Sequence, residues 1–189
     1  MLRRRVGLLG SALAWALPAA THAQSPAGAA AAPSLPPELA AELPGATWRG
    51  SGVMRYFGLP IYDLRLWSVA RLVGDGSAQP LALELVYARK LVGAQIASRS
   101  LDEMKHIGPF SETQAAQWLA ALTRLLPDVL AADRLTGVQR PGQAARFYFN
   151  GALRGEVADA DFVRLFFGIW LSPRTSAPAL RAQLLAGPP

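Results

Sequence analysis

The stretch TWRGSGVMRYFGLPIYDLRLWSV, residues 47–69, decides the fold of this chain. Its two halves are rich in Val, Ile, Phe, Tyr and Trp, and they flank Gly58-Leu59-Pro60, where glycine can adopt a positive φ and proline fixes its own. The stretch therefore predicts a β-hairpin. Because side chains alternate along a strand, Val53, Arg55 and Phe57 share one face of its first half.

An arginine between two apolar side chains has two interpretations, and both stay open at the level of sequence. Arg55 can extend into solvent, or pair with Asp63 or Glu84 across the sheet. It can also present a permanent cation inside a pocket, where an unpaired guanidinium is costly and a ligand or the protein must supply an anion. The second interpretation makes Arg55 a candidate ligand-binding residue.

Further along the chain, the apolar pattern alternates between strand and helix periods. Residues 80–91, PLALELVYARKL, predict a half-buried strand with Leu81, Leu83, Leu85 and Tyr87 on one face, so the Tyr87 hydroxyl would lie on the core side. Residues 93–108 have the period of a helix.

A second helix is predicted to begin at Ser111, because Ser-x-x-Gln is a capping-box pattern. Its apolar stripe would run from Trp118 to Val129, and Pro127 would end or bend it. Trp67, Trp118 and Trp170 are interpreted as core residues.

The C-terminal part returns to strands over residues 133–157, where Asn150-Gly151 is the strongest hairpin signal in the chain. Asp159 or Asp161 is expected to cap a third helix that ends at Ser172-Pro173. Ser176 is expected to cap a last helix over residues 177–186. Strands, two helices, strands and two helices predict an α+β fold with one antiparallel sheet and helices packed on one face.

The N-terminus has the pattern of a secretory signal. MLRRR precedes an uncharged run over residues 6–17, and Thr21-His22-Ala23 forms a small-x-small cleavage site. The run is shorter than the roughly 20 residues of a transmembrane helix. We therefore expect a signal peptide over 1–23 with cleavage after Ala23, a flexible Ala/Pro-rich tether over 24–38, and a domain over 39–189. The mature protein would be periplasmic or secreted, without stable membrane insertion.

Composition excludes several classes of function. The chain carries 19 basic and 13 acidic residues, but Arg3, Arg4 and Arg5 belong to the expected signal and the other arginines form no stripe, so no nucleic-acid partner is expected. There is no cysteine, and His106 is the single histidine after residue 23, so we expect no zinc site of the usual composition and no thiolate nucleophile. The chain has no phosphate loop, dinucleotide fingerprint or G-x-S-x-G elbow, and no cofactor is expected.

Several sequence blocks together resemble the bacterial chalcone isomerase-like domain over residues 44–187. They are GVMRYFG at 52–58, IYDLRLW at 61–67, LELVY at 83–87, FNG at 149–151 and the closing FVRLFFGIWL at 162–171. One departure is Ala132-Asp133, where that domain usually has Gly-Asp before its fourth strand. The resemblance implies an open-faced β-sandwich, a large antiparallel sheet covered by helices with a cleft between them.

The resemblance also implies roles for particular residues. In the plant enzymes of the superfamily, an arginine in the first hairpin holds the phenolate of a chalcone while it adds across the enone, and non-catalytic relatives use it for a fatty-acid carboxylate. Arg55 matches that arginine, and Tyr62 stands where the plant enzymes have a threonine near the substrate carbonyl. A hydroxyl such as Tyr62 or Tyr87 would polarise an enone oxygen. Arg55, Tyr62 and Tyr87 are therefore the candidate ligand-binding and catalytic residues.

Three functions are compatible with these patterns. The first is an exported protein that binds a small apolar anion, a fatty acid or aromatic acid, through Arg55. The second is an isomerase of the intramolecular lyase type acting on a chalcone-like enone. The third is an envelope interaction module without a ligand. An open cleft where Arg55 and a tyrosine hydroxyl converge would favour the first two, and a sealed cleft would favour the third.

Overall fold

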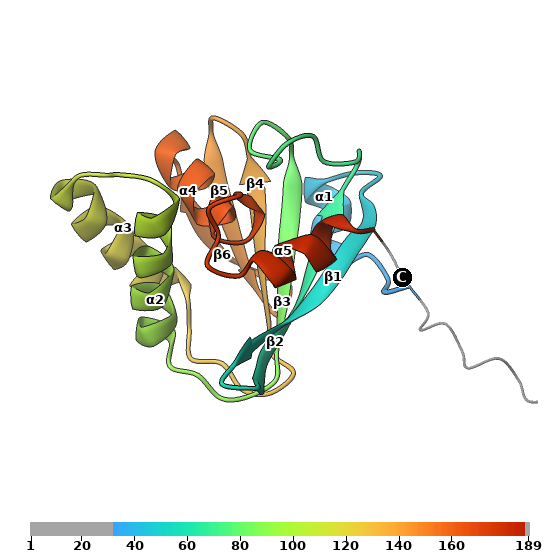
Figure 1. Cartoon of the computed structure of the whole chain (residues 1–189), viewed down its shortest axis with the longest axis horizontal. Coiled ribbons are helices and arrows are strands. Elements are labelled where there is room, and N and C mark those ends of the chain that lie inside the picture. The colour runs from blue at the N-terminus through green and yellow to red at the C-terminus, as the bar shows by residue number, and fades with distance from the viewer. Residues whose placement is uncertain (1–31, 188–189) are drawn as a thin grey trace, which may run out of the picture. The chain divides into compact units, whose positions relative to one another are not determined.

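The computed structural model describes residues 32–187, which form one six-stranded sheet and a set of helices (Figure 1). In chain order the elements are α1 (Pro37–Glu42), β1 (Thr47–Tyr56), β2 (Leu59–Ser68), β3 (Leu81–Tyr87), α2 (Gly93–Ile107), α3 (Glu112–Leu125), β4 (Arg134–Arg140), β5 (Ala144–Phe149), β6 (Ala152–Val157), α4 (Ala160–Leu171) and α5 (Pro178–Leu185).

The sheet is an antiparallel meander, in which β1 to β6 are neighbours in the order of the sequence. Both predicted hairpins are present. Asn150-Gly151 joins β5 and β6 with φ angles of 49° and 87°, as a type I′ turn requires. The first turn is Phe57-Gly58, with φ angles of 47° and 79°, and not the expected Gly58-Leu59-Pro60. Leu59 pairs with Tyr56 and already belongs to β2, because a two-residue turn with two positive φ angles matches the twist of the strands.

Helices α2 to α5 cover one face of the sheet, which confirms the predicted α+β fold class. Helix α5 packs on β1 and β2, α4 packs on β4 and β5, and α3 reaches β6 (Figure 1). Helix α2 packs against α3 and α4. The main apolar core lies between this helical layer and the sheet.

The short helix α1 covers part of the opposite face, and this was not predicted. Leu39 and Leu43 of α1 pack there in a second apolar cluster that includes Trp67 and Tyr148. Strand β3 is therefore buried on both faces and not half-buried as expected. Glu84, on its second face, is only 2% exposed.

The predicted helix caps are present with one exception, and one residue of a predicted apolar stripe lies outside its helix. Ser111 and Gln114 form the reciprocal capping box of α3, and Asp159 accepts backbone N–H groups at the start of α4. Val129 lies beyond the end of α3, where it pairs with Leu91 in an isolated bridge. Ser176 does not cap α5, whose N-cap is Ala177, because its hydroxyl is hydrogen-bonded to Glu103.

The expected signal peptide over 1–23 and the cleavage site lie outside the described residues, as do residues 24–31 of the expected tether. Helix α1 begins at Pro37, so the expected boundary between 38 and 39 falls inside a helix. Glu38 is buried and forms an ion pair with Arg134 of β4, which makes it part of the folded domain. Over residues 32–187, no helix is both long enough and apolar enough to cross a bilayer.

Candidate functional site

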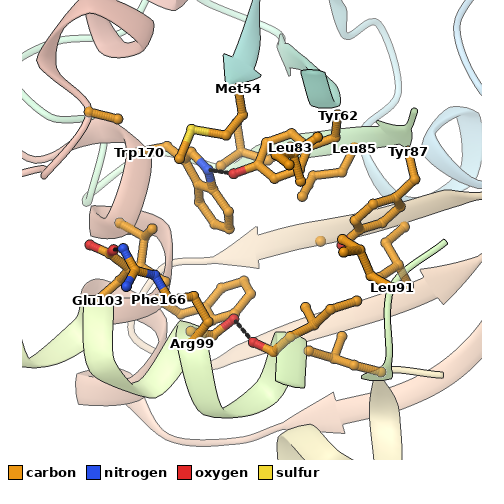
Figure 2. A pocket seen from close by; sticks show the side chains of 18 of the residues that line it. Met54, Tyr62, Leu83, Leu85, Tyr87, Leu91, Arg99, Glu103, Phe166 and Trp170 are labelled. Carbon is orange, nitrogen blue, oxygen red and sulfur yellow. Dashed lines mark hydrogen bonds and ion pairs between the residues drawn. The ribbon is translucent and has the colours of Figure 1, made fainter. Parts of the chain in front are cut away.

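A cavity of about 410 Å³ lies between the sheet and the helical layer (Figure 2). This volume is within the usual range of small-molecule sites. Its walls are mostly apolar, and strands β1 to β4 with helices α2 and α4 supply most of them. The apolar side chains that line it include Met54, Leu83, Leu85, Leu91, Ile96, Leu126, Leu135, Phe147, Phe166 and Ile169.

Strand alternation explains which residues of the sheet reach the cavity. On β3, Leu83, Leu85 and Tyr87 share the face predicted from the sequence, and all three line the cavity. On the hairpin, the inward positions are Met54 of β1 and Tyr62 of β2, which pair across the two strands. The sheet therefore presents two tyrosines to the cavity, and both were candidate site residues.

The Tyr62 hydroxyl is oriented by a tryptophan. Nε1 of Trp170 donates a hydrogen bond of 2.9 Å to Oη of Tyr62 (Figure 2). Burial raises the pKa of Tyr62 to about 12, although the hydrogen bond from Trp170 acts in the opposite direction. The phenol is therefore neutral near pH 7, and because Trp170 uses one of its lone pairs, its own O–H proton remains for a third partner. Trp170, expected as a core residue, is buried and also positions this hydroxyl.

Tyr87 packs edge-to-face against Tyr62, with ring centroids 5.8 Å apart. It is only 3% exposed, and burial raises the pKa of its phenol as well. Its hydroxyl forms no hydrogen bond with any residue in the described part of the chain. Because Tyr87 lines the cavity, this hydroxyl is available to a polar atom of a ligand.

Charged residues reach the cavity from α2. Arg99 and Glu103 line it one helical turn apart and form an ion pair. The Ser176 hydroxyl donates a hydrogen bond of 2.6 Å to Oε2 of Glu103. The Glu103 side chain is 8% exposed and that of Arg99 is 66% exposed, so the guanidinium lies at the mouth of the cavity. Arg99 is the one basic residue among those that line the cavity within residues 32–187.

Arg55 does not line the cavity. Its side chain is exposed, and Nη1 donates to the Gly58 carbonyl oxygen at 3.2 Å. Because Met54 faces the cavity, alternation turns Arg55 to the other side of β1, together with the exposed Val53. The structure thus brings Tyr62 and Tyr87 together and leaves Arg55 apart from them, in agreement with the solvent-exposed interpretation of this arginine.

The expected acidic partners of Arg55 are also apart from it. Glu84 lies on the α1 side of the sheet, where Arg134 and Arg65 form ion pairs with it and Nε1 of Trp67 donates to it. Asp63 is exposed and forms no ion pair with a residue in the range 32–187.

Sequence reasoning missed Arg99, Glu103 and Ser176. Arg99 and Glu103 are four residues apart in a predicted helix, which is the ordinary spacing of a surface ion pair and gives no sign of a cavity. Ser176 was assigned to a helix cap.

The architecture has a counterpart among solved structures. An Arabidopsis thaliana fatty-acid binding protein matches the fold with a TM-score of 0.60, over 75% of this chain and 87% of that one, at 11% sequence identity. A likeness at this identity shows a common fold.

The family is shown by the sequence itself. The model of the chalcone isomerase-like family matches residues 50–186, and this chain belongs to that family. An uncharacterized protein of Haemophilus influenzae is 26% identical over 144 residues, which is 75% of this chain and 70% of the relative.

Proposed function

We propose that this protein is exported and binds a small apolar carboxylate, a fatty acid or an aromatic acid, in the cavity between sheet and helices. The observation that carries the proposal is an apolar cavity of about 410 Å³ that contains two neutral tyrosine hydroxyls and one arginine. Family membership and the fatty-acid binding named for the Arabidopsis protein of the same fold support it.

The polar groups suggest how the ligand is oriented. An ionised carboxylate needs hydrogen-bond donors in an apolar site, and a guanidinium is the strongest available. We propose that the carboxylate lies between Arg99 and the Tyr62 hydroxyl. Arg99 has five N–H donors and its pairing with Glu103 leaves others free, while the Tyr62 proton is free because Trp170 is a donor to the same oxygen. The apolar part of the ligand then extends among Leu83, Leu85 and the neighbouring apolar residues.

The two alternative functions receive less support. The isomerase mechanism requires Arg55 and a tyrosine hydroxyl to act on one substrate, and Arg55 lies on the far side of β1 from Tyr62. An interaction module without a ligand was expected to have its cleft sealed by side chains, and an open cavity favours a ligand. We therefore propose binding and not chemistry.

Calorimetric titration with dodecanoate, and with its methyl ester as a matched uncharged ligand, tests the proposal. We expect the acid to bind and Arg99→Ala to weaken it about tenfold to a hundredfold, because a hydrogen bond to a charged group contributes about 1.5–3 kcal/mol. The same substitution should leave binding of the ester nearly unchanged.

Arg55→Ala is the matched control, since it removes an exposed arginine outside the cavity and tests the sequence-based hypothesis at the same time. A loss of acid binding in Arg55→Ala and not in Arg99→Ala would reverse the assignment. Equal binding of acid and ester by every variant would exclude an anion site. Conversion of a chalcone by the wild type would support the isomerase alternative.

A further inference from the structure

The β1–β2 hairpin, whose turn lies at one end of the sheet (Figure 1), carries an exposed apolar cluster, which we call the apolar tip and define as Tyr56, Phe57 and Leu59. Their side chains are 59%, 87% and 51% exposed. Single exposed apolar residues are common on protein surfaces, but a group of three at one turn indicates a contact surface.

Phe57 also occupies a backbone conformation that disfavours it. Its φ is 47°, in the left-handed region where a bulky side chain is strained. The other two-residue hairpin turn of this chain has nearly the same geometry, with Asn150 at a φ of 49° in the equivalent position. Asn is the residue that this turn position prefers. Phe57 therefore lowers stability through strain and through exposure, which suggests that it is retained for a contact.

Three cations flank the apolar tip. Arg55 precedes it in β1, and Arg89 and Lys90 follow Ala88, whose N–H donates to the Ile61 carbonyl at 2.9 Å. These residues therefore leave the sheet at the end where the tip lies (Figure 1). None of the three cations forms an ion pair with a residue in the described range 32–187.

We propose that the apolar tip and its flanking cations dock on the surface of an anionic lipid bilayer. Aromatic rings are favourable at the level of the headgroups, and each basic residue near an anionic surface adds to the attraction. A second copy of this chain is a poorer partner, because two tips in contact would bring six cations together.

The position of the tip connects docking to the cavity. Tyr56 belongs both to the apolar tip and to the cavity lining, and Met54 and Ile61 of the same hairpin line the cavity as well. In a docked molecule, the part of the cavity that the hairpin lines would therefore lie at the bilayer surface. An apolar acid is concentrated in that bilayer. The docking itself requires no ligand and is separable from the proposed function.

Co-sedimentation of the full protein with lipid vesicles tests this proposal. The two vesicle preparations are phosphatidylcholine alone and an equal mixture of phosphatidylcholine and phosphatidylglycerol. We expect binding to the mixed vesicles and little to the neutral ones. Phe57→Asn should weaken binding to mixed vesicles about tenfold or more, because an aromatic side chain no longer leaves water.

The controls separate docking from folding. Phe57→Asn gives the turn an Asn-Gly pair, so this variant should fold at least as stably as the wild type. Leu153→Asn removes another exposed leucine, 57% exposed on β6, and should bind vesicles like the wild type. A double variant with Arg89→Glu and Lys90→Glu, which reverses two of the flanking charges, should abolish the preference for the anionic mixture. Arg124→Glu, which reverses a charge on α3, should not.

Three results would overturn the proposal. They are a wild type that sediments with neither vesicle, equal binding by Phe57→Asn and Leu153→Asn, and a concentration-dependent dimer that Phe57→Asn abolishes. Dodecanoate binding without vesicles should be unchanged in Phe57→Asn, so failure of docking and failure of ligand binding can be told apart.

Discussion

Ala132 shows how a single residue departs from the pattern of the family and what that costs. It stands where the chalcone isomerase-like domain usually has glycine, and its φ is 71°. Its N–H nevertheless donates to the Tyr87 carbonyl at 2.8 Å, so the turn before β4 keeps its hydrogen bond. The departure noted in the sequence therefore corresponds to local strain and not to a different fold.

Ala132→Gly should stabilise the protein by about 0.5–1 kcal/mol. A non-glycine residue in the left-handed region costs about 1–2 kcal/mol, and the added freedom of glycine in the unfolded chain returns part of this. Denaturant unfolding measures the difference. Ala131→Gly is the control, because the φ of Ala131 is not positive, and it should lose about 0.5 kcal/mol. An equal loss in both variants would contradict the assigned strain.

Arg55 and Tyr62 show what a sequence can and cannot predict about a site. Alternation correctly predicts that Val53 and Arg55 share one face, but it does not say which face meets the helices, since each face of β1 carries apolar residues. Tyr87 was easier to place, because three leucines of β3 lie on its face and fix that face as the core side. Arg99 looks like an ordinary surface residue until the packing of α2 over the sheet is known.

At the scale of elements, α1 is held on the outer face of the sheet by two carboxylates. Glu38 forms an ion pair with Arg134 and accepts a hydrogen bond from the Thr136 hydroxyl at 3.1 Å. Glu42 forms ion pairs with Arg140 at 2.6 Å and Arg146 at 2.9 Å, and it accepts a hydrogen bond from Tyr148. These contacts make α1 part of the folded domain.

Acid should release α1 before the rest of the fold. Burial acts to raise the pKa of Glu42, but hydrogen bonds from Tyr148, Arg146 and Arg140 outweigh it and hold this pKa below its ordinary value of 4.5. A carboxylate whose pKa is lowered on folding contributes stability above its unfolded pKa, and this contribution is lost as the pH falls below about 4.5. The protection of amides over residues 37–43, measured as the hydrogen-exchange rate relative to the intrinsic rate at the same pH, should therefore fall on acidification.

Glu42→Gln should lower that protection already at neutral pH and remove most of its dependence on acid. Glu112→Gln is the control, because Glu112 is exposed at the start of α3 and no ion pair connects it to the sheet in the part of the chain that the structure describes. If Glu42→Gln left the acid dependence of amide protection in α1 unchanged, the carboxylate would not be what holds the helix.

Element types and order follow from the sequence because their signals are local. The Asn150-Gly151 turn, the Ser111 capping box and the alternation of β3 each lie within a few residues, and each is confirmed. The predictions that were wrong or missing concern residues whose partners are distant in the sequence. Ser176 has the type and position of a cap but bonds to Glu103, and α1 was absent from the prediction because its partners Arg134 and Arg146 lie far along the chain.

At the scale of the whole domain, the sheet separates two kinds of interior. The face toward α1 carries the paired charges around Glu38, Glu42 and Glu84, where each carboxylate has a basic partner. The face toward α2, α4 and α5 carries the cavity, where the Tyr87 hydroxyl lacks a partner in residues 32–187. The carboxylates of the α1 face are thus satisfied within the protein, whereas the Tyr87 hydroxyl of the cavity is available to a ligand.

Native mass spectrometry of the protein purified from its own host, beside Arg99→Ala and Arg55→Ala variants, tests the central claim most directly. We expect the wild type to carry an apolar acid, Arg55→Ala to retain it and Arg99→Ala to lose it. We also expect each protein mass to correspond to a chain that begins at Gln24, because the proposed export would remove residues 1–23. A wild type that carries no acid, or an acid retained equally by both variants, would contradict the proposed anion site.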